Sequence, residues 1–231
     1  MTWANTNSNT ANTVTAPIYQ FVDTPLLRVG YRAFEPADGT SAAGVVMLLH
    51  GWPDNPATWD RVVPHLVQAG YRVIVPALRG FSPTTFLNDD TPRTGQLAAL
   101  GRDLVDLIAA LGIHRPVLVG HDWGARAVAN ACGLVADLAS HMVLLSVGYG
   151  TNNPSQSISM EQARRYWYHW YMATPRGQAE VAANRRAFAQ IMWDTWSPPG
   201  WYDAPTFSAA ADAFDNPDWL PITLHSYQHR W

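Results

Sequence analysis

The sequence is short of cysteine, of basic charge and of long hydrophobic runs, and each shortage excludes a class of protein. Its single cysteine, Cys132, excludes an intrachain disulfide and favours a reducing, cytoplasmic setting. The formal net charge of −3 offers no basic surface of the kind that binds nucleic acid. No apolar run approaches the roughly 18 residues of a membrane span, and no signal-peptide pattern opens the chain. We therefore expect a cytoplasmic protein that binds neither nucleic acid nor membrane.

Hydrophobic residues are abundant, and their pattern divides the chain into three parts. Hydrophobic residues make up 48% of the 231 residues and charged residues 14%, which suits one globular domain with a substantial core. Residues 1–16 are rich in Asn and Thr and are expected to be a disordered tail. Residues 17–148 alternate strand-like and helix-like runs. Beyond Gly148 the strand rhythm stops, so residues 149–231 are expected to be a helical insertion.

The alternation over the first two thirds of the chain predicts an α/β fold with a mostly parallel sheet flanked by helices and right-handed crossovers. The expected strands are Tyr19–Asp23, Leu26–Phe34, Val45–Leu49, Tyr71–Pro76, Pro116–Val119 and Met142–Val147. The expected helices are Trp59–Ala69, Leu97–Leu111, Ala125–Leu134, Met160–Ala173, Gln178–Trp193 and, approximately, Thr206–Phe214.

The most informative motif is Gly120-His121-Asp122-Trp123-Gly124, which follows an apolar strand and precedes a helix-like run. This is the frame of a nucleophile elbow, usually G-x-S-x-G, with a carboxylate at the serine position. Small residues at 120 and 124 allow a tight strand-to-helix turn that presents Asp122. A carboxylate nucleophile attacks an sp³ carbon and forms an alkyl ester, which suits epoxides and alkyl halides. A βα turn with a chance aspartate is the alternative interpretation.

A second motif, His50-Gly51-Trp52-Pro53-Asp54, directly follows the strand Val45–Leu49. Gly51 lets the chain turn close to the elbow, and Pro53 stiffens the turn. The backbone N–H of Trp52 can then lie beside that of Trp123. Two such donors form an oxyanion hole for charge that develops during ester hydrolysis.

With these motifs the chain resembles the α/β-hydrolase superfamily, and within it the epoxide hydrolases and related dehalogenases. The resemblance covers roughly residues 18–231 and includes Arg79-Gly80-Phe81 and the insertion after Val147. It implies that the insertion is an α-helical cap over the active site, and that Asp122 is the catalytic nucleophile.

The epoxide-hydrolase branch implies two cap tyrosines that donate hydrogen bonds to the epoxide oxygen. Tyr168 matches the first position and Tyr227 the second, with Tyr166 and Tyr171 as nearby competitors. Proton donation matters because an alkoxide is a poor leaving group. The substrate pocket is expected to include the residues His50, Pro53, His169 and Trp170, with His50 serving as a hydrogen-bonding group rather than as a base.

A dehalogenase is the rival interpretation. Trp123 stands beside the nucleophile, as a halide-binding tryptophan does in haloalkane dehalogenases, although those enzymes usually carry Asn where this chain has Trp52. Fluoroacetate dehalogenases use two arginines to hold the substrate carboxylate. Arg126 matches one of them, whereas Trp123 stands at the other position. A neutral substrate is therefore favoured over a small anion.

The resemblance also implies a histidine base and an acid that this sequence does not supply. The loop Gly148–Pro154 contains no Asp or Glu, and the only late histidines are His225 and His229. The last core strands are expected to be missing, as in a C-terminal truncation, so activity should be impaired. A non-catalytic remnant is a further alternative. No metal or cofactor is expected, and the partners are a small-molecule substrate and water.

Overall fold

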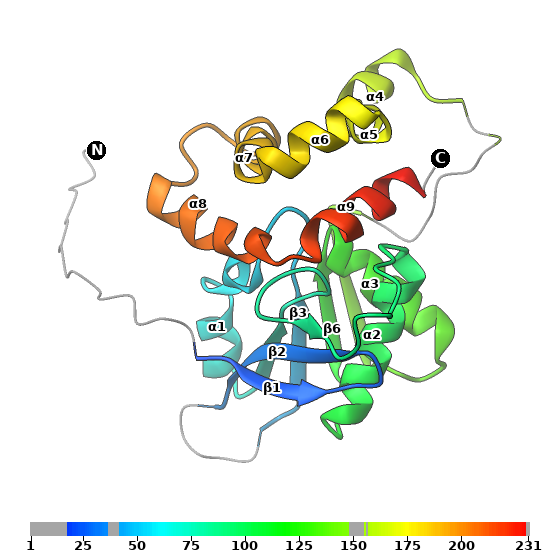
Figure 1. The fold of residues 1–231 in the computed structure, drawn as a ribbon. Helices are drawn as coiled ribbons and strands as arrows, with labels where there is room; N and C mark the ends of the chain where they lie inside the picture. Colours follow the sequence, from blue (N-terminus) through cyan, green and yellow to red (C-terminus); the bar gives the residue numbers. More distant parts are fainter. Residues whose placement is uncertain (1–17, 37–41, 148–154, 156, 230–231) are drawn as a thin grey trace, which may run out of the picture.

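The computed structural model describes residues 18–36, 42–147, 155 and 157–229. Figure 1 shows a sheet with helices on its faces and a further group of helices gathered above it. The strands that the structure describes lie between Gln20 and Leu145, and the part described from Met160 to Gln228 is helical. The expected tail 1–16 and the loop Gly148–Pro154 lie outside the described ranges.

The sheet has seven strands in the order β1-β2-β4-β3-β6-β7, and β5 pairs with β2. β3 runs parallel to β4 and β6, and β6 runs parallel to β7, whereas β2 is antiparallel to β1, β4 and β5. The expectation of a mostly parallel α/β sheet is confirmed. The strands are β1 (Gln20–Asp23), β2 (Leu27–Phe34), β3 (Val45–Leu49), β4 (Arg72–Pro76), β5 (Thr85–Phe86), β6 (Val117–His121) and β7 (His141–Leu145).

Helices α2 (Leu97–Ala110) and α3 (Trp123–Leu134) pack against each other beside the sheet, as the sequence predicts. The single helix expected over Trp59–Ala69 is wrong. The structure has a 3₁₀ turn, η1 (Pro56–Trp59), and then a short helix, α1 (Val63–Gln68). Pro64 in the first turn of α1 explains the break, because proline has no N–H with which to continue a preceding helix.

The helical segment, residues 160–228, is more broken than its periodicity predicts. The expected helix Met160–Ala173 divides at Tyr166, and the expected helix Gln178–Trp193 divides at Asn184. Helix α9 was not predicted. The helices are α4 (Met160–Arg165), α5 (Trp167–Ala173), α6 (Pro175–Ala183), α7 (Arg185–Trp196), α8 (Ala204–Ala211), the 3₁₀ turn η2 (Asp212–Asp215) and α9 (Trp219–Gln228).

Capping explains several of these boundaries. The side chains of Ser159, Thr174 and Asp203 each accept a hydrogen bond from a backbone N–H in the first turn of α4, α6 and α8. Gly177 lets α6 approach α5 closely, since a Cβ there would lie 1.9 Å from the backbone oxygen of Tyr171. Local polar groups therefore set the ends of these helices, while the apolar pattern sets only their buried faces.

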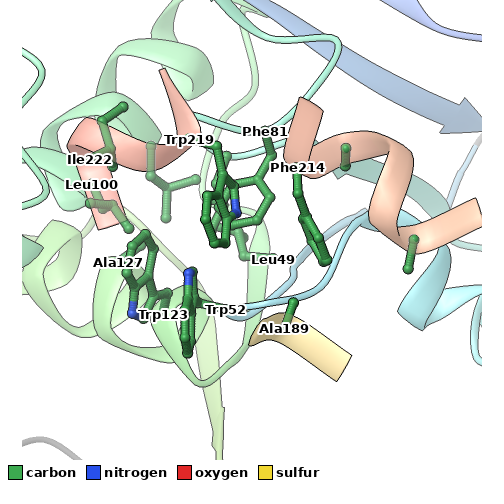
Figure 2. Packing of buried hydrophobic residues seen from close by; sticks show 14 of the residues in the cluster. Leu49, Trp52, Phe81, Leu100, Trp123, Ala127, Ala189, Phe214, Trp219 and Ile222 are labelled. Carbon is green, nitrogen blue, oxygen red and sulfur yellow. The ribbon is translucent and has the colours of Figure 1, made fainter. Parts of the chain in front are cut away.

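The sheet separates two hydrophobic clusters. Met47 and Leu49 of β3 belong to the larger cluster, whereas the alternate residues Val46 and Leu48 belong to the smaller one, as expected for a strand buried on both faces. The larger cluster continues into the helical segment, and Figure 2 shows Trp219 of α9 packed among aromatic residues from the sheet region. This shared core fixes the helical segment over the elbow.

Strand β7 stands at one end of the strand order and is unusually exposed. Met142, Val143 and Leu145 are 51%, 43% and 41% exposed. An exposed edge strand with apolar side chains is a site for association with other chains.

Candidate active site

Asp122 lies at the turn between β6 and α3, with φ 50° and ψ −113°. A positive φ is strained for a residue other than glycine, and such strain gathers at functional sites. The two flanking glycines allow the turn to close. A Cβ at Gly120 would lie 2.3 Å from the oxygen of Gly124, and a Cβ at Gly124 would lie 2.2 Å from the oxygen of Leu49. The structure thus places the Gly-x-Asp-x-Gly motif in an elbow.

The loop after β3 reaches the Asp122 carboxylate. The backbone N–H of Trp52 donates a 2.9 Å hydrogen bond to Oδ1 of Asp122. A Cβ on Gly51 would lie 2.7 Å from the Cβ of Asp122, so only glycine permits this approach. Trp123 is the first residue of α3, and the first N–H groups of a helix have no partner within the helix.

The side chain of His50 stabilises this loop through hydrogen bonds to the backbone. Its ring is fully buried, and its Nε2 accepts a 3.1 Å hydrogen bond from the N–H of Leu78. The Nδ1 atom must then carry the proton and donate to the oxygen of Gly51, 2.9 Å away. Burial lowers the pKa of His50 to about 4, which keeps it neutral. We therefore correct the expectation that His50 lines the substrate pocket, because both ring nitrogens bind backbone groups.

The two tyrosines expected from the resemblance lie together in the helical segment. Tyr168 of α5 and Tyr227 of α9 are 8% and 2% exposed, and their ring centroids lie 5.2 Å apart. The ring of Trp52 contacts both, at 5.9 Å and 4.8 Å. The hydroxyl of Tyr227 accepts a 3.2 Å hydrogen bond from the indole N–H of Trp123. The structure therefore brings Tyr168, Tyr227 and the residues around Asp122 into one cluster.

Among the cavities formed by described residues, two have Asp122 in their walls. One is about 390 Å³ and lies toward Tyr168, His169 and Arg126. The other is about 420 Å³ and lies toward Pro53 and the indole rings of Trp193 and Trp196. Each is large enough to hold a small organic molecule. Asp122 therefore borders a cavity on two sides.

Two of the expected pocket residues thus line a cavity with Asp122, namely Pro53 and His169. Trp170 is placed differently. It is 38% exposed, and its indole N–H donates a 3.0 Å hydrogen bond to the oxygen of Ala163 in α4. This contact turns its polar edge toward α4, and the assignment of Trp170 to the substrate pocket stays a prediction.

Asp54 is a site residue whose importance the sequence reasoning missed, although it belongs to the second motif. Its side chain lines the same cavity as Asp122, and its Oδ1 accepts a hydrogen bond from the N–H of Asn55 at 2.8 Å. Burial raises the pKa of Asp54 to about 7, and the negative charge of Asp122 adds to the rise. Loss of hydration thus sets the direction of the shift, and the nearby like charge acts in the same direction. The sequence signal was an acid within a loop motif that was expected to lie beside the nucleophile.

Indole hydrogen bonds across the two parts of the molecule were also missed. Trp193 of α7 donates to the oxygen of Pro53 at 2.7 Å, and Trp52 donates to Oγ1 of Thr223 in α9 at 3.0 Å. Figure 2 shows Trp52 and Trp123 side by side in the core. The abundance of tryptophan was visible in the sequence, but these partners are 140 and 171 residues apart. Such pairs have no local sequence signal.

Over the ranges described, no group of three or more His, Cys, Asp or Glu side chains could hold a metal ion. Within the same ranges, no helix has the length and hydrophobicity required to cross a membrane.

Comparison with known proteins gives one family and a consistent set of relatives. The family described as the alpha/beta hydrolase fold matches residues 44–207. Epoxide hydrolase A of Mycobacterium tuberculosis is 32% identical over 189 residues, which are 80% of this chain and 57% of the relative. Epoxide hydrolase 3 of Siraitia grosvenorii is 40% identical over 111 residues, which are 48% of this chain and 34% of the relative.

A solved structure shows the same similarity to epoxide hydrolases. The crystal structure of a candidate epoxide hydrolase from Klebsiella pneumoniae superposes with a TM-score of 0.85 and 38% identity, over 92% of this chain and 70% of that one. The chain spans between about a third and somewhat over half the length of the curated relatives given above.

Proposed function

Because the chain belongs to the α/β hydrolase fold family, we propose that it is a hydrolase of epoxide-hydrolase type with Asp122 as its nucleophile. The proposed substrate is a small, neutral epoxide, and water is the second substrate. The observation that carries the proposal is the placement of Asp122. It occupies a strained elbow, accepts the N–H of Trp52 and lines two cavities beneath the tyrosine-bearing helices.

In the proposed reaction, one carboxylate oxygen of Asp122 attacks an epoxide carbon. The ring C–O bond breaks, and its electron pair remains on the epoxide oxygen. That oxygen takes a proton from the phenol of Tyr168 or Tyr227, and the resulting phenolate regains a proton from water. The product is an ester between Asp122 and a hydroxyalkyl group.

The backbone N–H groups of Trp52 and Trp123 are proposed to stabilise the oxygen charge that develops when the ester is hydrolysed. The 2.9 Å bond from Trp52 to the carboxylate supports this role. For Trp123 the support is its place at the N-terminus of α3, where backbone N–H groups favour negative charge.

We propose that ester formation by the 231-residue chain is faster than ester hydrolysis, because no residue matches the family's histidine base and its acid. Of the two late histidines, His225 accepts the N–H of Gly95 through Nδ1, and burial lowers its pKa. His229 lines the 390 Å³ cavity with Asp122. His229 is therefore the better placed of the two to activate water.

An epoxide is proposed rather than an alkyl halide because of the side chain of Trp123. A halide-binding tryptophan offers its indole N–H to the departing ion. Here that N–H donates to Tyr227 in the buried cluster. A phenol supported in this way suits a leaving oxygen that needs a proton, whereas a departing halide needs none.

The test is intact-protein mass spectrometry after incubation with styrene oxide. We expect the mass of the chain to rise by the mass of one epoxide, with little diol released. The Asp122→Asn variant should show no such rise, because an amide is a poor nucleophile, and Tyr168→Phe should slow it. Sustained diol release would contradict slow hydrolysis. An unmodified wild-type chain would favour the non-catalytic remnant.

A further inference from the structure

A hydrogen bond inside the aromatic cluster connects the elbow helix to the helical segment. The indole Nε1 of Trp123 donates to the hydroxyl oxygen of Tyr227 at 3.2 Å. The two residues are 1% and 2% exposed, and their ring centroids lie 5.8 Å apart. Trp123 immediately follows Asp122, so this bond ties the tyrosine to the nucleophile's own helix.

The direction of this bond is fixed by chemistry. An indole N–H can only donate, whereas a phenol has one proton to donate and two lone pairs that accept. The oxygen of Tyr227 must therefore be the acceptor. Its own proton cannot point toward Trp123, so it is directed to another side of the hydroxyl.

Two aromatic neighbours of Tyr227 line a cavity. Its ring contacts Tyr168 at 5.2 Å and His169 at 4.7 Å. Both of these residues line the cavity of about 390 Å³ that also contains Asp122. The neighbours of Tyr227 on this side are thus walls of the cavity in which the substrate is proposed to bind.

We infer that the indole N–H of Trp123 is a positioning group, which directs the proton of Tyr227 toward the substrate oxygen and strengthens Tyr227 as an acid. An N–H donor stabilises a phenolate more than a phenol, because the hydrogen bond is stronger to the charged form. Burial of the pair keeps water from replacing this donor. The inference rests on the proposed function, since it concerns the proton that opens the epoxide.

The variant that tests the role is Trp123→Phe, which removes the N–H and keeps an aromatic ring. Ester formation with styrene oxide should become about 10- to 100-fold slower, as expected for loss of a hydrogen bond to a group that becomes charged. The matched control is Trp59→Phe. Trp59 is 5% exposed, lies in the smaller cluster, and has no hydrogen-bond partner for its indole N–H within the described ranges. Its substitution should change the rate by less than about 2-fold.

A double-mutant cycle separates positioning from packing. In a Tyr227→Phe background there is no hydroxyl to orient, so adding Trp123→Phe should slow ester formation by less than about 2-fold. An equal slowing in both backgrounds would overturn the inference, because the indole would then act through packing. An unchanged rate for the single variant would overturn it as well.

A spectroscopic readout keeps the inference testable if the wild-type chain forms no ester. Tyrosine ionisation is followed by ultraviolet absorbance, and subtraction of the Tyr227→Phe variant isolates one phenol. In the Trp123→Phe background this phenol should ionise at higher pH than in the wild-type background. An identical titration in both backgrounds would overturn the inference, whereas a missing ester with a shifted titration would count against the proposed function alone.

Discussion

The two parts of the molecule hold the candidate site by different means. In the sheet region, residues 20–145, glycines allow close approach of neighbouring segments, to backbone atoms at Gly120 and Gly124 and to the side chain of Asp122 at Gly51. The helical segment, residues 160–228, is joined to this region by three indole N–H hydrogen bonds, among other side-chain contacts. It also approaches the sheet region through the backbone at Gly95, where a Cβ would lie 2.2 Å from the backbone oxygen of Ile222. The geometry of the nucleophile is therefore set by backbone sterics, whereas the placement of the proposed acids depends in addition on side-chain hydrogen bonds between the two regions.

This difference predicts which substitutions are severe and which are graded. A Cβ added at a close backbone contact leaves no neighbour that can move cheaply, so the fold itself is affected. Loss of an indole N–H removes one hydrogen bond and leaves the fold in place. The predictions below would break or sharpen that contrast.

The largest effect is expected for Gly120→Ala. The new Cβ would lie 2.3 Å from the backbone oxygen of Gly124, so the free energy of unfolding should fall by about 4 kcal/mol or more. The matched control is Gly133→Ala in α3, where nothing lies within 4 Å of the new Cβ. Alanine there should stabilise the helix by up to about 1 kcal/mol. Urea denaturation measures both, and equal stabilities would contradict the steric account.

A smaller effect is expected from Asp54→Asn, through the pH dependence of stability. The folded-state pKa of about 7 lies above the ordinary value of 3.8, so the folded state binds more protons between these pH values. The free energy of unfolding should therefore fall as pH rises from about 4 to about 7. Asp54 is only half-buried, so water screens part of this effect and limits the loss to about 2–3 kcal/mol.

The Asp54→Asn variant should lack this loss, because its amide does not ionise. Denaturation series at pH 4, 5.5 and 7 measure the slope, and the exposed Asp90→Asn serves as control. If Asp54→Asn left the pH dependence of the free energy of unfolding unchanged, the pKa of Asp54 would not be raised in the folded protein.

The smallest effect is expected from Trp193→Phe, which removes the N–H bound to the oxygen of Pro53. Trp219→Phe removes another buried indole, 0% exposed against 7% for Trp193, whose N–H has no hydrogen-bond partner over the described ranges. Trp193→Phe should cost about 1 kcal/mol more stability than Trp219→Phe, the usual net value of one hydrogen bond. Equal costs would mean that packing alone, and not indole hydrogen bonding, joins the two regions.

The same contrast explains how much of the structure could be predicted. The elbow at Asp122 and the loop at Trp52 follow from glycine positions and short apolar runs, which are local in sequence. The parallel arrangement of β3, β4, β6 and β7 follows from alternation of strands and helices. Backbone sterics leave a local signature, so these features were predictable.

The helical segment was less predictable because its boundaries depend on capping and on distant contacts. Tyr166 and Asn184 interrupt runs whose periodicity alone predicts continuous helices. Helix α9 gave no clear amphipathic pattern, since it is buried among aromatic residues of both regions. The raised pKa of Asp54 and the partner of the Trp123 indole also depend on residues far apart in the chain.

The most direct test of the account is the position of the ester. After incubation with styrene oxide, proteolysis and tandem mass spectrometry should locate one added epoxide on Asp122, within the segment 116–126. Asp54, which shares the cavity and has the raised pKa, is the internal comparison and should remain unmodified. An adduct on Asp54 or on surface carboxylates, with Asp122 unmodified, would contradict the assignment of Asp122 as the nucleophile.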